Sequence, residues 1–390
     1  KIALCFDKEY YEYLYNNSQN FLNLDEEVVK KVITKACELK AKVVGIDEKE
    51  NGIRALLNYG HSFGHVVECL TDYRVYTHGE GVVIGMNFAN KLAEFLGITS
   101  KEYSDLCSEL FKKYGLSYDI PKFDFERMLE VLKRDKKNRD NKLKFVFSEE
   151  LGKAHTESVS IEKIKEFYDN IDGNTVKAVI DMGTNTCRLF IAEVKNGNLQ
   201  VPYLKRMEIV SLGEGVNESK ILKEEAINRT IKVLKEYKIL ADQMGVTNIV
   251  AKATSATRDA ENREYFINRA LVEADIKIDC ISGQDEGNYT FKGATLDIKD
   301  KIILIDIGGG STEVIVGDFK GIEYIKSFNV GAIRIKEKFF ENDDFITNFD
   351  TAKEWVLDEF KELKNLNIKD YKLVAVAGTA TTQVTVRDKI

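Results

Sequence analysis

Hydrophobic and polar positions repeat with two different periods along this chain of 390 residues. Up to about residue 170, apolar residues recur every three to four positions, which is the spacing of a helix with one buried face. This spacing predicts a mainly helical region, with helices over Glu27–Val44, Ile53–Leu70, Gly81–Phe95 and Tyr103–Tyr114 and one strand over Lys142–Phe147. The polar stretch Asp169–Thr175 is predicted to be a linker, because Asp, Asn and Gly favour turns and loops.

After the linker, the pattern changes to short β-branched strands separated by helices. The first set of strands is predicted over Val176–Ile180, Arg188–Val194, Lys205–Ser211, Asn248–Thr254 and Lys277–Ile281, with helices over Lys223–Gln243 and Arg263–Ala274. A second set is predicted over Ile302–Ile305, Thr312–Val316, Tyr324–Asn329 and Lys372–Val376. Such alternation is typical of an α/β domain, and we expect it to have two related lobes.

Two glycine-rich turns, each led by an aspartate, join strands of this second region. They are Asp181-Met-Gly-Thr-Asn185 and Asp306-Ile-Gly-Gly-Gly-Ser311. A hairpin of this kind can direct backbone N–H groups at an anion, and its aspartate can hold a divalent metal or the water on that metal. One such turn is more often a plain hairpin, since Asp and Gly are common turn residues. Two of them predict a duplicated fold that holds one phosphate chain from both sides.

Three further polar segments follow predicted strands. Ser282–Glu286 opens a helix and places carboxylates at its start, while Thr254–Arg258 supplies a guanidinium that suits phosphate oxygens. Gly378–Thr382 adds N–H and hydroxyl donors. Taken singly, Arg258 would more often be a surface ion pair and Glu286 a carboxylate favoured by the helix dipole.

Five segments occur in order between residues 176 and 390, namely V-I-D-M-G-T-N-T-C-R-L, S-L-G-E-G, A-T-S-A-T-R-D-A, I-S-G-Q-D-E and I-D-I-G-G-G-S-T-E. In these segments the chain resembles the exopolyphosphatase / guanosine pentaphosphate phosphatase (Ppx/GppA) family. The resemblance implies an actin-like (ribonuclease H-like) fold with the active site in the cleft between two lobes, the second lobe being incomplete here. It also implies Mg²⁺-dependent release of the terminal phosphate from polyphosphate or guanosine pentaphosphate.

The same resemblance assigns roles to individual residues. Glu286 matches the general base for the attacking water, and Arg258 matches a phosphate-binding group. Magnesium would be held by Asp181, Asp306 and Glu313. The other residues implied to bind phosphate are Asn185, Thr186, Gly309, Gly310, Ser311, Gly378 and Thr379. In-line attack by water needs a base, a metal and donors that spread charge, so the roles agree with the chemistry.

The first region contains three of the chain's four histidines within a short stretch. His61 and His65 are four positions apart, on one helix face, and His78 follows in Thr-His-Gly-Glu. Neutral imidazoles so arranged suit Zn²⁺, although a helix with two satisfied imidazoles is the plainer interpretation. Gly60 and Gly64 lower helix stability by about 1 kcal/mol each, which favours a close approach by something else.

Four segments of this region are similar to the C-terminal half of 3-dehydroquinate synthase: C-E-L-K-A-K-V-V, R-A-L-L-N-Y-G-H-S-F-G-H, H-G-E-G and R-D-K-K-N-R-D-N-K-L. This resemblance implies that His61 and His78 are ligands of Zn²⁺ or Co²⁺. Residues implied to bind or act on the phosphorylated sugar-acid substrate are Lys1, Lys40, Arg54, Asn58, His65 and Lys136. A third metal ligand and the NAD-binding domain are expected to precede Lys1, so the segment is expected to be inactive alone.

The basic stretch Lys133–Lys144 allows two interpretations. Read from composition, it is a solvated face or a weak nucleic-acid patch. The synthase resemblance makes it a phosphate clamp, which we favour. The chain as a whole carries a net charge of −7, which argues against general nucleic-acid binding. No apolar run approaches the roughly 18 residues that span a bilayer. Six scattered cysteines without C-x-x-C favour reduced thiols, and we expect a cytoplasmic protein, with a homodimer among its assemblies.

The leading hypothesis is a phosphatase fused to part of a dehydroquinate synthase of the shikimate pathway. Its expected domains are residues 1–172, of synthase type, 173–299, the first actin-like lobe, and 300–390, the second lobe. Synthase activity of a full-length parent is one alternative. An actin-like ATP-binding kinase or ATPase is another, but such proteins lack Ser-Gly-Gln-Asp-Glu at this place. A third treats the first region as a helical interaction module without catalysis.

Overall fold

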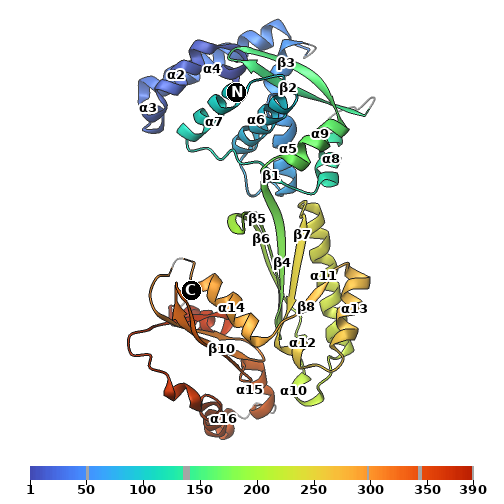
Figure 1. The fold of residues 1–390 in the computed structure, drawn as a ribbon, viewed down its shortest axis with the longest axis vertical. Helices are drawn as coiled ribbons and strands as arrows, with labels where there is room; N and C mark the ends of the chain where they lie inside the picture. Colours follow the sequence, from blue (N-terminus) through green and yellow to red (C-terminus); the bar gives the residue numbers. More distant parts are fainter. Residues whose placement is uncertain (50–51, 135–140, 297, 341–344, 389–390) are drawn as a thin grey trace. The chain divides into compact units, whose positions relative to one another are not determined.

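The computed structural model describes residues 1–49, 52–134, 141–296, 298–340 and 345–388 (Figure 1). The chain forms two compact units. Unit 1 comprises residues 1–177, 191–203 and 241–248, and unit 2 comprises 178–190, 204–240 and 249–390. The predicted domain boundaries at 172 and 299 stay predictions. No helix among the described residues is long and apolar enough to cross a membrane.

Most of unit 1 is helical, as its periodicity predicted. Its helices are α1 (Ile2–Phe6), α2 (Lys8–Asn16), α3 (Ser18–Leu22), α4 (Glu26–Ile46), the 3₁₀ helix η1 (Ile53–Asn58), α5 (His61–Leu70), α6 (His78–Phe95), α7 (Lys101–Lys113), α8 (Phe125–Arg134) and α9 (Ile161–Asn170). The strands β2 (Lys142–Glu150) and β3 (Lys153–Ser160) form an antiparallel hairpin. Phe88 lies at the centre of the core, where it stacks on Phe63 with 4.0 Å between ring centroids and meets Phe167 edge-on.

The predicted helix over Ile53–Leu70 is wrong as a single element. The chain forms the 3₁₀ turn η1, leaves it at Tyr59, and begins α5 after Gly60. Gly60 has φ +83°, a left-handed conformation that favours glycine. A Cβ there would lie 2.6 Å from the side chain of Met86, so the break is fixed by the neighbouring helix α6 rather than by local sequence.

Glycines allow α5 and α6 to meet backbone to backbone. A Cβ on Gly64 would lie 2.9 Å from the carbonyl oxygen of Gly81, and one on Gly85 would overlap the carbonyl oxygen of Gly60. The close approach that the glycines suggested is therefore the approach of α6 to α5. Thr77 begins α6 with a capping box that pairs it reciprocally with Glu80.

A mixed sheet follows, with strand order β6-β5-β4-β7-β8 and β1 (Pro121–Lys122) beside β4. Its strands are β4 (Asn174–Met182), β5 (Thr186–Lys195), β6 (Asn198–Ile209), β7 (Asn248–Ala253) and β8 (Ile278–Cys280). The linker predicted over Asp169–Thr175 is shorter, because α9 continues to Asn170 and β4 already begins at Asn174. Alternate residues of β4 are buried, in particular Ala178 and Ile180.

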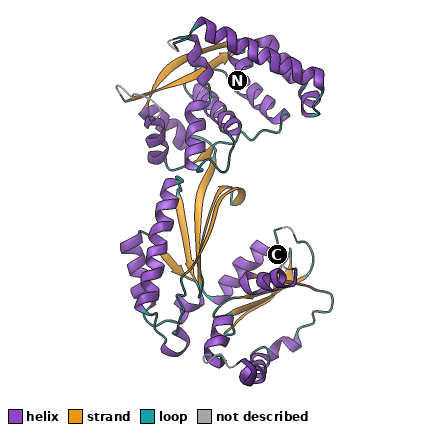
Figure 2. Cartoon of the chain, turned by 180° about the vertical axis from the view of Figure 1, so that it is seen from behind, coloured by secondary structure: helices purple, strands orange, loops and turns teal. Residues whose placement is uncertain are grey.

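Helices α11 (Glu224–Gln243) and α13 (Arg263–Ala274) lie along the same side of this sheet (Figure 2). Shorter helices α10 (Val216–Ser219) and α12 (Ser255–Asp259) connect its strands, and α14 (Gly283–Ala294) follows β8. The strands and helices predicted for this stretch are confirmed with differences of a few residues at their ends, except that β6 begins at Asn198 rather than at Lys205.

A second sheet has the order β11-β10-β9-β12. It consists of β9 (Ile302–Ile307), β10 (Thr312–Asp318), β11 (Gly321–Phe328) and β12 (Lys372–Val376). Strands β9 and β10 are antiparallel, and β12 runs parallel to β9. The accompanying helices are α15 (Ala332–Phe339), α16 (Phe345–Glu359), η2 (Lys361–Asn365) and α17 (Ala377–Asp388). The second predicted set of strands is therefore confirmed.

Candidate active site

The two Asp-Gly turns of unit 2 have the same local geometry. In the first, the amide of Gly183 donates to the carbonyl oxygen of Thr186 at 2.9 Å. In the second, the amide of Gly308 donates to the carbonyl oxygen of Ser311, also at 2.9 Å. Each turn closes a hairpin, between β4 and β5 and between β9 and β10. The two segments that share this strand-turn-strand pattern therefore adopt the same local structure.

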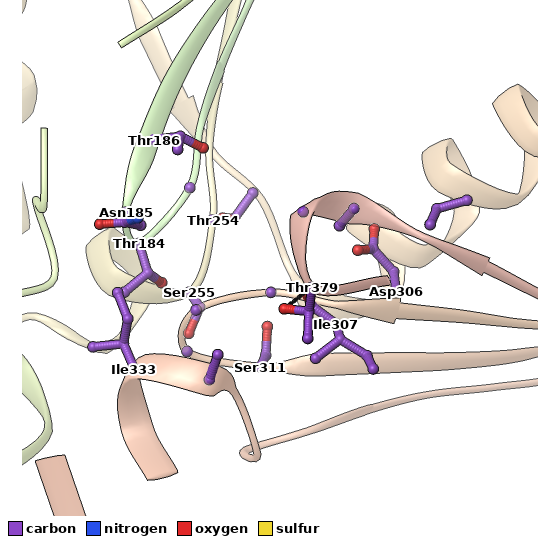
Figure 3. Close-up of a pocket in the computed structure, with 18 of the residues that line it drawn as sticks. Thr184, Asn185, Thr186, Thr254, Ser255, Asp306, Ile307, Ser311, Ile333 and Thr379 are labelled. Atoms are coloured by element: carbon purple, nitrogen blue, oxygen red, sulfur yellow. Dashed lines mark hydrogen bonds between the residues drawn. The ribbon is translucent and has the colours of Figure 1, made fainter. Parts of the chain in front are cut away.

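Both hairpins open onto one cavity of about 790 Å³ (Figure 3). Its lining combines acidic residues, small hydroxyl residues and glycines from both sheets. Within the described residues, the amides of Gly309 and Gly310 donate to no backbone carbonyl. Backbone donors that have no internal partner are suited to an anion. The cavity is therefore large enough and polar enough for a chain of phosphates.

Three carboxyl groups line this cavity: Asp181 at the end of β4, Asp306 at the end of β9, and Glu286 in the first turn of α14. Burial raises the pKa of each, and the charge of Asp306 raises the pKa of Asp181 further. For Glu286, burial and the nearby Glu313 raise the pKa to about 8. Acids gathered in this way repel one another, and a cation between them would relieve that repulsion.

Glu313 lies behind the cavity wall rather than in it. The residue is 1% exposed, and its Oε1 accepts a hydrogen bond of 2.6 Å from the hydroxyl of Ser327. It faces Asp306 across the β9–β10 ladder. Burial raises its pKa, and the charge of Asp306 adds to this shift.

The acidic group fits a magnesium ion of limited protein coordination. Among the described residues, no three His, Cys, Asp or Glu side chains converge closely enough to hold one ion by themselves. Magnesium usually keeps several waters and binds through one or two carboxylates together with substrate phosphates. Asp181 and Asp306 supply that number of carboxylates in the lining of the cavity.

The guanidinium of Arg258, in α12, orients Glu286. Its Nη1 donates to Glu286 Oε2 at 3.2 Å and to the carbonyl oxygen of Ile281 at 3.1 Å. Arg258 is not itself among the lining residues. Its charge opposes the upward shift in the pKa of Glu286. In the absence of substrate, Arg258 therefore acts on the carboxyl group rather than on the cavity.

The cavity also contains residues that sequence reasoning missed. Arg188 brings a positive charge that acts on both Asp181 and Asp306, and Thr290 donates to Asp306 Oδ2 at 3.2 Å. The hydroxyls of Thr184 and Ser255 are buried and have no hydrogen-bond partner among the described residues. Arg188 lies inside a strand that the alternating pattern already explained, but its place two positions after Thr186 could have pointed to it.

Gly310 sits against these two hydroxyls. A Cβ at this position would lie 2.5 Å from Ser255 Oγ and 2.8 Å from Thr184 Oγ1. The sticks of Figure 3 show Thr184 and Ser255 near Ser311, although they come from different elements. A phosphate oxygen is the kind of acceptor that these orphan donors lack.

The other residues predicted to bind phosphate line the same cavity. They are Asn185, Thr186, Gly309, Gly310, Ser311, Gly378 and Thr379. Thr379 donates to the carbonyl oxygen of Ile307 at 3.2 Å, and Asn185 accepts from Ser211 at 3.1 Å. Gly378 and Thr379 belong to the first turn of α17. Their roles as phosphate ligands stay predictions.

In unit 1, the three imidazoles of His61, His65 and His78 form one cluster. Their ring centroids are 5.3 Å apart for His61 and His78, 5.9 Å for His61 and His65, and 6.2 Å for His65 and His78. The buried carboxylate of Glu68 contacts Nδ1 of His65 at 3.1 Å and Nδ1 of His78 at 2.8 Å. Sequence reasoning missed Glu68, which follows His65 by one turn of α5.

This cluster fits a metal in part. A carboxylate on Nδ1 orients an imidazole and leaves Nε2 for a metal, as Glu68 does for two of the rings. Burial and the charge of Lys1 lower the pKa of His61 to about 4, so this ring stays neutral and able to ligate at pH 7. The described residues contain no complete set of three ligands. His61 and His78 as zinc ligands stay a prediction.

The residues expected to hold the sugar-acid substrate have varied surroundings. Lys40 and Asn58 are exposed, and Arg54 donates to the carbonyl oxygen of Glu48 at 2.7 Å. Lys136, with much of the basic stretch around it, lies outside the described residues. Their common role is therefore still a prediction.

Paired Asp-Gly hairpins around one polar cavity define the class of phosphate-handling proteins with an actin-like fold. A family profile described as "Ppx/GppA phosphatase family" matches residues 190–389, and one described as "3-dehydroquinate synthase C-terminal" matches residues 1–138. The chain belongs to the Ppx/GppA phosphatase family, and a partial dehydroquinate synthase domain precedes its phosphatase domain.

Individual proteins show the same two resemblances. The bifunctional 3-dehydroquinate synthase/phosphatase of Fusobacterium nucleatum is 41% identical over 401 aligned residues, which cover 99% of this chain and 60% of that protein. The 3-dehydroquinate synthase of Thermoanaerobacter pseudethanolicus is 40% identical over 164 residues, 42% of this chain and 46% of the synthase. The crystal structure of an exopolyphosphatase-like protein matches 56% of this chain and 70% of its own, with a TM-score of 0.53 and 28% identity. The chain thus spans less than two thirds of these two curated relatives.

Proposed function

We propose that the phosphatase part hydrolyses the terminal phosphoanhydride of polyphosphate or guanosine pentaphosphate. The observation that carries this proposal is Glu286, a partly buried carboxyl group held by Arg258 at the wall of a cavity lined by two Asp-Gly hairpins. A base whose pKa lies near the working pH is the most effective proton acceptor in such a reaction. The raised pKa of Glu286, to about 8, supports that role.

In the proposed reaction, the terminal phosphoryl group lies against the amides of Gly309 and Gly310 and the hydroxyls of Thr184 and Ser255. Glu286 accepts a proton from the attacking water, and Arg258 fixes which carboxyl oxygen faces that water. Arg188 and the turn amides offset the charge that develops on the phosphoryl oxygens. Asp181 and Asp306, with Glu313 behind them, would hold Mg²⁺, which supplies charge neutralisation of the phosphate chain when it is bound.

The test is phosphate release from long-chain polyphosphate and from guanosine pentaphosphate, with and without Mg²⁺. We expect Glu286→Gln to lower kcat by about 10²- to 10⁴-fold, with a small change in KM, because the proton acceptor is lost and the shape is kept. Glu264→Gln is the matched control, since Glu264 is an exposed carboxylate on α13. An unchanged rate in Glu286→Gln would refute the assignment. Transfer of phosphate from ATP to a sugar would instead favour the actin-like kinase.

For the first part of the chain, we propose the metal- and substrate-binding segment of a dehydroquinate synthase. His61 and His78 would hold Zn²⁺ or Co²⁺, while Lys40, Arg54, Asn58, His65 and Lys136 would contact the phosphorylated sugar-acid substrate. The full reaction also needs NAD. Binding of Co²⁺, followed by visible absorption, tests the metal assignment. We expect His61→Ala and His78→Ala to abolish the signal and His155→Ala, the remaining histidine, to preserve it.

A further inference from the structure

A buried carboxyl group in unit 1 is used by neither proposed site. Glu193, on β5, is 1% exposed. Its Oε1 accepts hydrogen bonds from the hydroxyl of Tyr76, at 2.5 Å, and from the hydroxyl of Tyr203. Its Oε2 accepts from Asn174 Nδ2 at 2.7 Å. We call Tyr76, Asn174, Glu193 and Tyr203 the junction cluster.

The junction cluster joins residues from the two family segments. Tyr76 lies in the stretch that matches the synthase profile, whereas Glu193 and Tyr203 lie in the stretch that matches the phosphatase profile. Asn174 begins β4, between the two matches. The rings of Tyr76 and Tyr203 also meet edge-on, with 6.3 Å between their centroids. One carboxyl group is thus shared across the fusion.

Backbone contacts in unit 1 reinforce the same junction. Strand β1 pairs with the start of β4, Pro121 facing Asn174. The amide of Asp124 donates to the carbonyl oxygen of Gly245 at 2.8 Å. Gly245 has φ +63°, and a Cβ there would lie 2.9 Å from Cβ of Phe123. Contacts this close between residues 121–124 and the later part of the chain can form only when both family segments are folded.

The chemistry of the cluster explains why both segments are needed. A carboxyl group buried in a strand is costly unless donors surround it, and here the donors come from three places in the chain. Burial and the charge of Glu193 raise the pKa of Tyr76 and of Tyr203, so both phenols remain donors across the physiological range. If either segment unfolds, Glu193 or its donors are left unpaired, which costs more than the bonds themselves.

Tyr76 also lies next to the imidazole cluster along the chain. It precedes Thr77, the N-cap of α6, and His78 follows at the first position of that helix. The loop from Thr71 to Thr77 connects α5 to α6. It therefore determines where α6 begins and where the imidazole of His78 lies.

We propose that the junction cluster is an interface between the two family segments, through which Glu193 of the phosphatase segment positions the 71–77 loop and His78 of the synthase segment. Tyr76 and Glu193 are positioning residues, because neither contacts the candidate substrates. Only the Co²⁺ titration described below depends on the proposed function, because it assumes that His61 and His78 bind a metal. The two segments consequently behave as one folding unit at the junction.

Hydrogen exchange on the full chain separates this interface from simple stability. Tyr76→Phe removes the bond across the segments, and Tyr203→Phe removes a bond to the same carboxyl oxygen within the phosphatase segment. We expect Tyr76→Phe to speed exchange of amides 71–80 by about tenfold, and Tyr203→Phe to change those amides much less. Equal effects of the two variants on residues 71–80, or no effect of Tyr76→Phe there, would overturn the proposal.

A second pair of variants checks the carboxyl group. Glu193→Leu leaves three donors unpaired and should speed exchange throughout unit 1 by about a hundredfold. Glu193→Gln should largely rescue it: its amide oxygen can accept from both tyrosines, and once the Asn174 amide turns over, its amide nitrogen can donate to Asn174 Oδ1, a buried atom without a partner among the described residues. If Gln and Leu are equally damaging, hydrogen bonding to Glu193 is not the cause.

Titration with Co²⁺ alone supplies the readout at the imidazoles. We expect weaker Co²⁺ binding in Tyr76→Phe than in Tyr203→Phe. Should the unaltered chain take up no Co²⁺, the metal assignment proposed above is wrong, while the exchange data still decide the interface. Equal Co²⁺ affinity in both variants, together with Co²⁺ binding by the unaltered chain, would contradict the positioning of His78.

Discussion

The cavity of unit 2 between the two Asp-Gly hairpins and the imidazole cluster of unit 1 are built by opposite means. In the cavity, turn backbone and small side chains provide the surface, and the charged groups include acids whose pKa values are raised. In the imidazole cluster, side chains on two helices provide the donors, and one carboxylate, Glu68, holds two of the three rings. Glycine is needed in both, but for different reasons.

Because of this difference, the two sites should respond differently when a glycine is substituted. In the cavity, Gly310 leaves room for the hydroxyls of Thr184 and Ser255, which are proposed to donate to the phosphate. Beside the imidazole cluster, Gly60, Gly64 and Gly85 let α5 and α6 touch so closely that a Cβ would clash with the facing backbone. A substitution at the first kind of glycine should damage binding, whereas one at the second should damage folding.

The largest effect is expected for Gly85→Ala. Its Cβ would overlap the carbonyl oxygen of Gly60 and lie 2.7 Å from the amide nitrogen of Gly64, so backbone must move. We expect a loss of about 3 kcal/mol or more in unfolding free energy, measured by urea denaturation, and loss of Co²⁺ binding. Unchanged denaturation would show that α5 and α6 are not held by this contact.

Gly310→Ala should sharpen the contrast. The new Cβ would crowd the side-chain oxygens of Thr184 and Ser255, which can shift more easily than backbone. We therefore expect a modest loss of stability, about 1 kcal/mol, and a weakening of inorganic phosphate binding by about tenfold. Calorimetric titration with phosphate measures the affinity. Loss of stability without loss of affinity would remove the distinction between the two kinds of glycine.

The raised pKa of Glu286 predicts how pH affects unit 2 in the absence of Mg²⁺. A carboxyl group whose pKa rises from 4.5 to about 8 on folding keeps its proton up to a higher pH in the folded state than in the unfolded state. Its contribution to stability is therefore present below pH 4.5 and is lost as the pH rises to about 8.

Thermal unfolding of the metal-free chain from pH 5 to 8 measures this effect. We expect Tm to fall with rising pH more steeply in the unaltered chain than in Glu286→Gln, whose side chain does not titrate. Carboxyl groups remote from Glu286 titrate equally in both proteins, so the difference between the slopes reports Glu286 together with Glu313, whose charge acts on it. Identical slopes would contradict the assigned pKa shift.

The smallest effect is expected for Gly79→Ala, the control for Gly85→Ala on the same helix. A Cβ on Gly79 would meet nothing within 4 Å. Alanine should then raise the unfolding free energy by about 0.5 kcal/mol, through helix propensity alone. Urea denaturation measures it, and destabilisation here would mean that α6 tolerates no alanine for reasons unrelated to α5.

Sequence patterns predicted the second half of the fold well, because its strands carry apolar alternation and its turns carry Asp and Gly. They failed where long-range contacts decide the local structure. The break at Gly60 depends on Met86 of another helix. Strand β3, with the sequence Lys-Ala-His-Thr-Glu-Ser-Val-Ser, has few apolar residues, and its pairing with β2 makes it a strand.

The same reason explains which site residues the sequence could predict. Asp181, Asp306 and Glu286 were found because they occur in turns or at a helix start with recognisable neighbours. Arg188 and Thr290 were missed because no local pattern marks them. Only the folded structure, in which two sheets and α14 enclose one cavity, places their side chains in its lining. Glu193 and Tyr76 are far apart in the chain, and only the folded structure brings them together.

The glycine contact between α5 and α6 has a consequence for how this sequence can change over generations. Where main chain touches main chain, repacking of the surrounding core cannot slide one helix along the other. The distance between His61 and His78 should therefore stay the same when Phe63, Phe88 and their neighbours mutate. A saturation scan of unit 1 should find these aromatic positions permissive to other large apolar residues, and Gly60, Gly64, Gly81 and Gly85 nearly invariant.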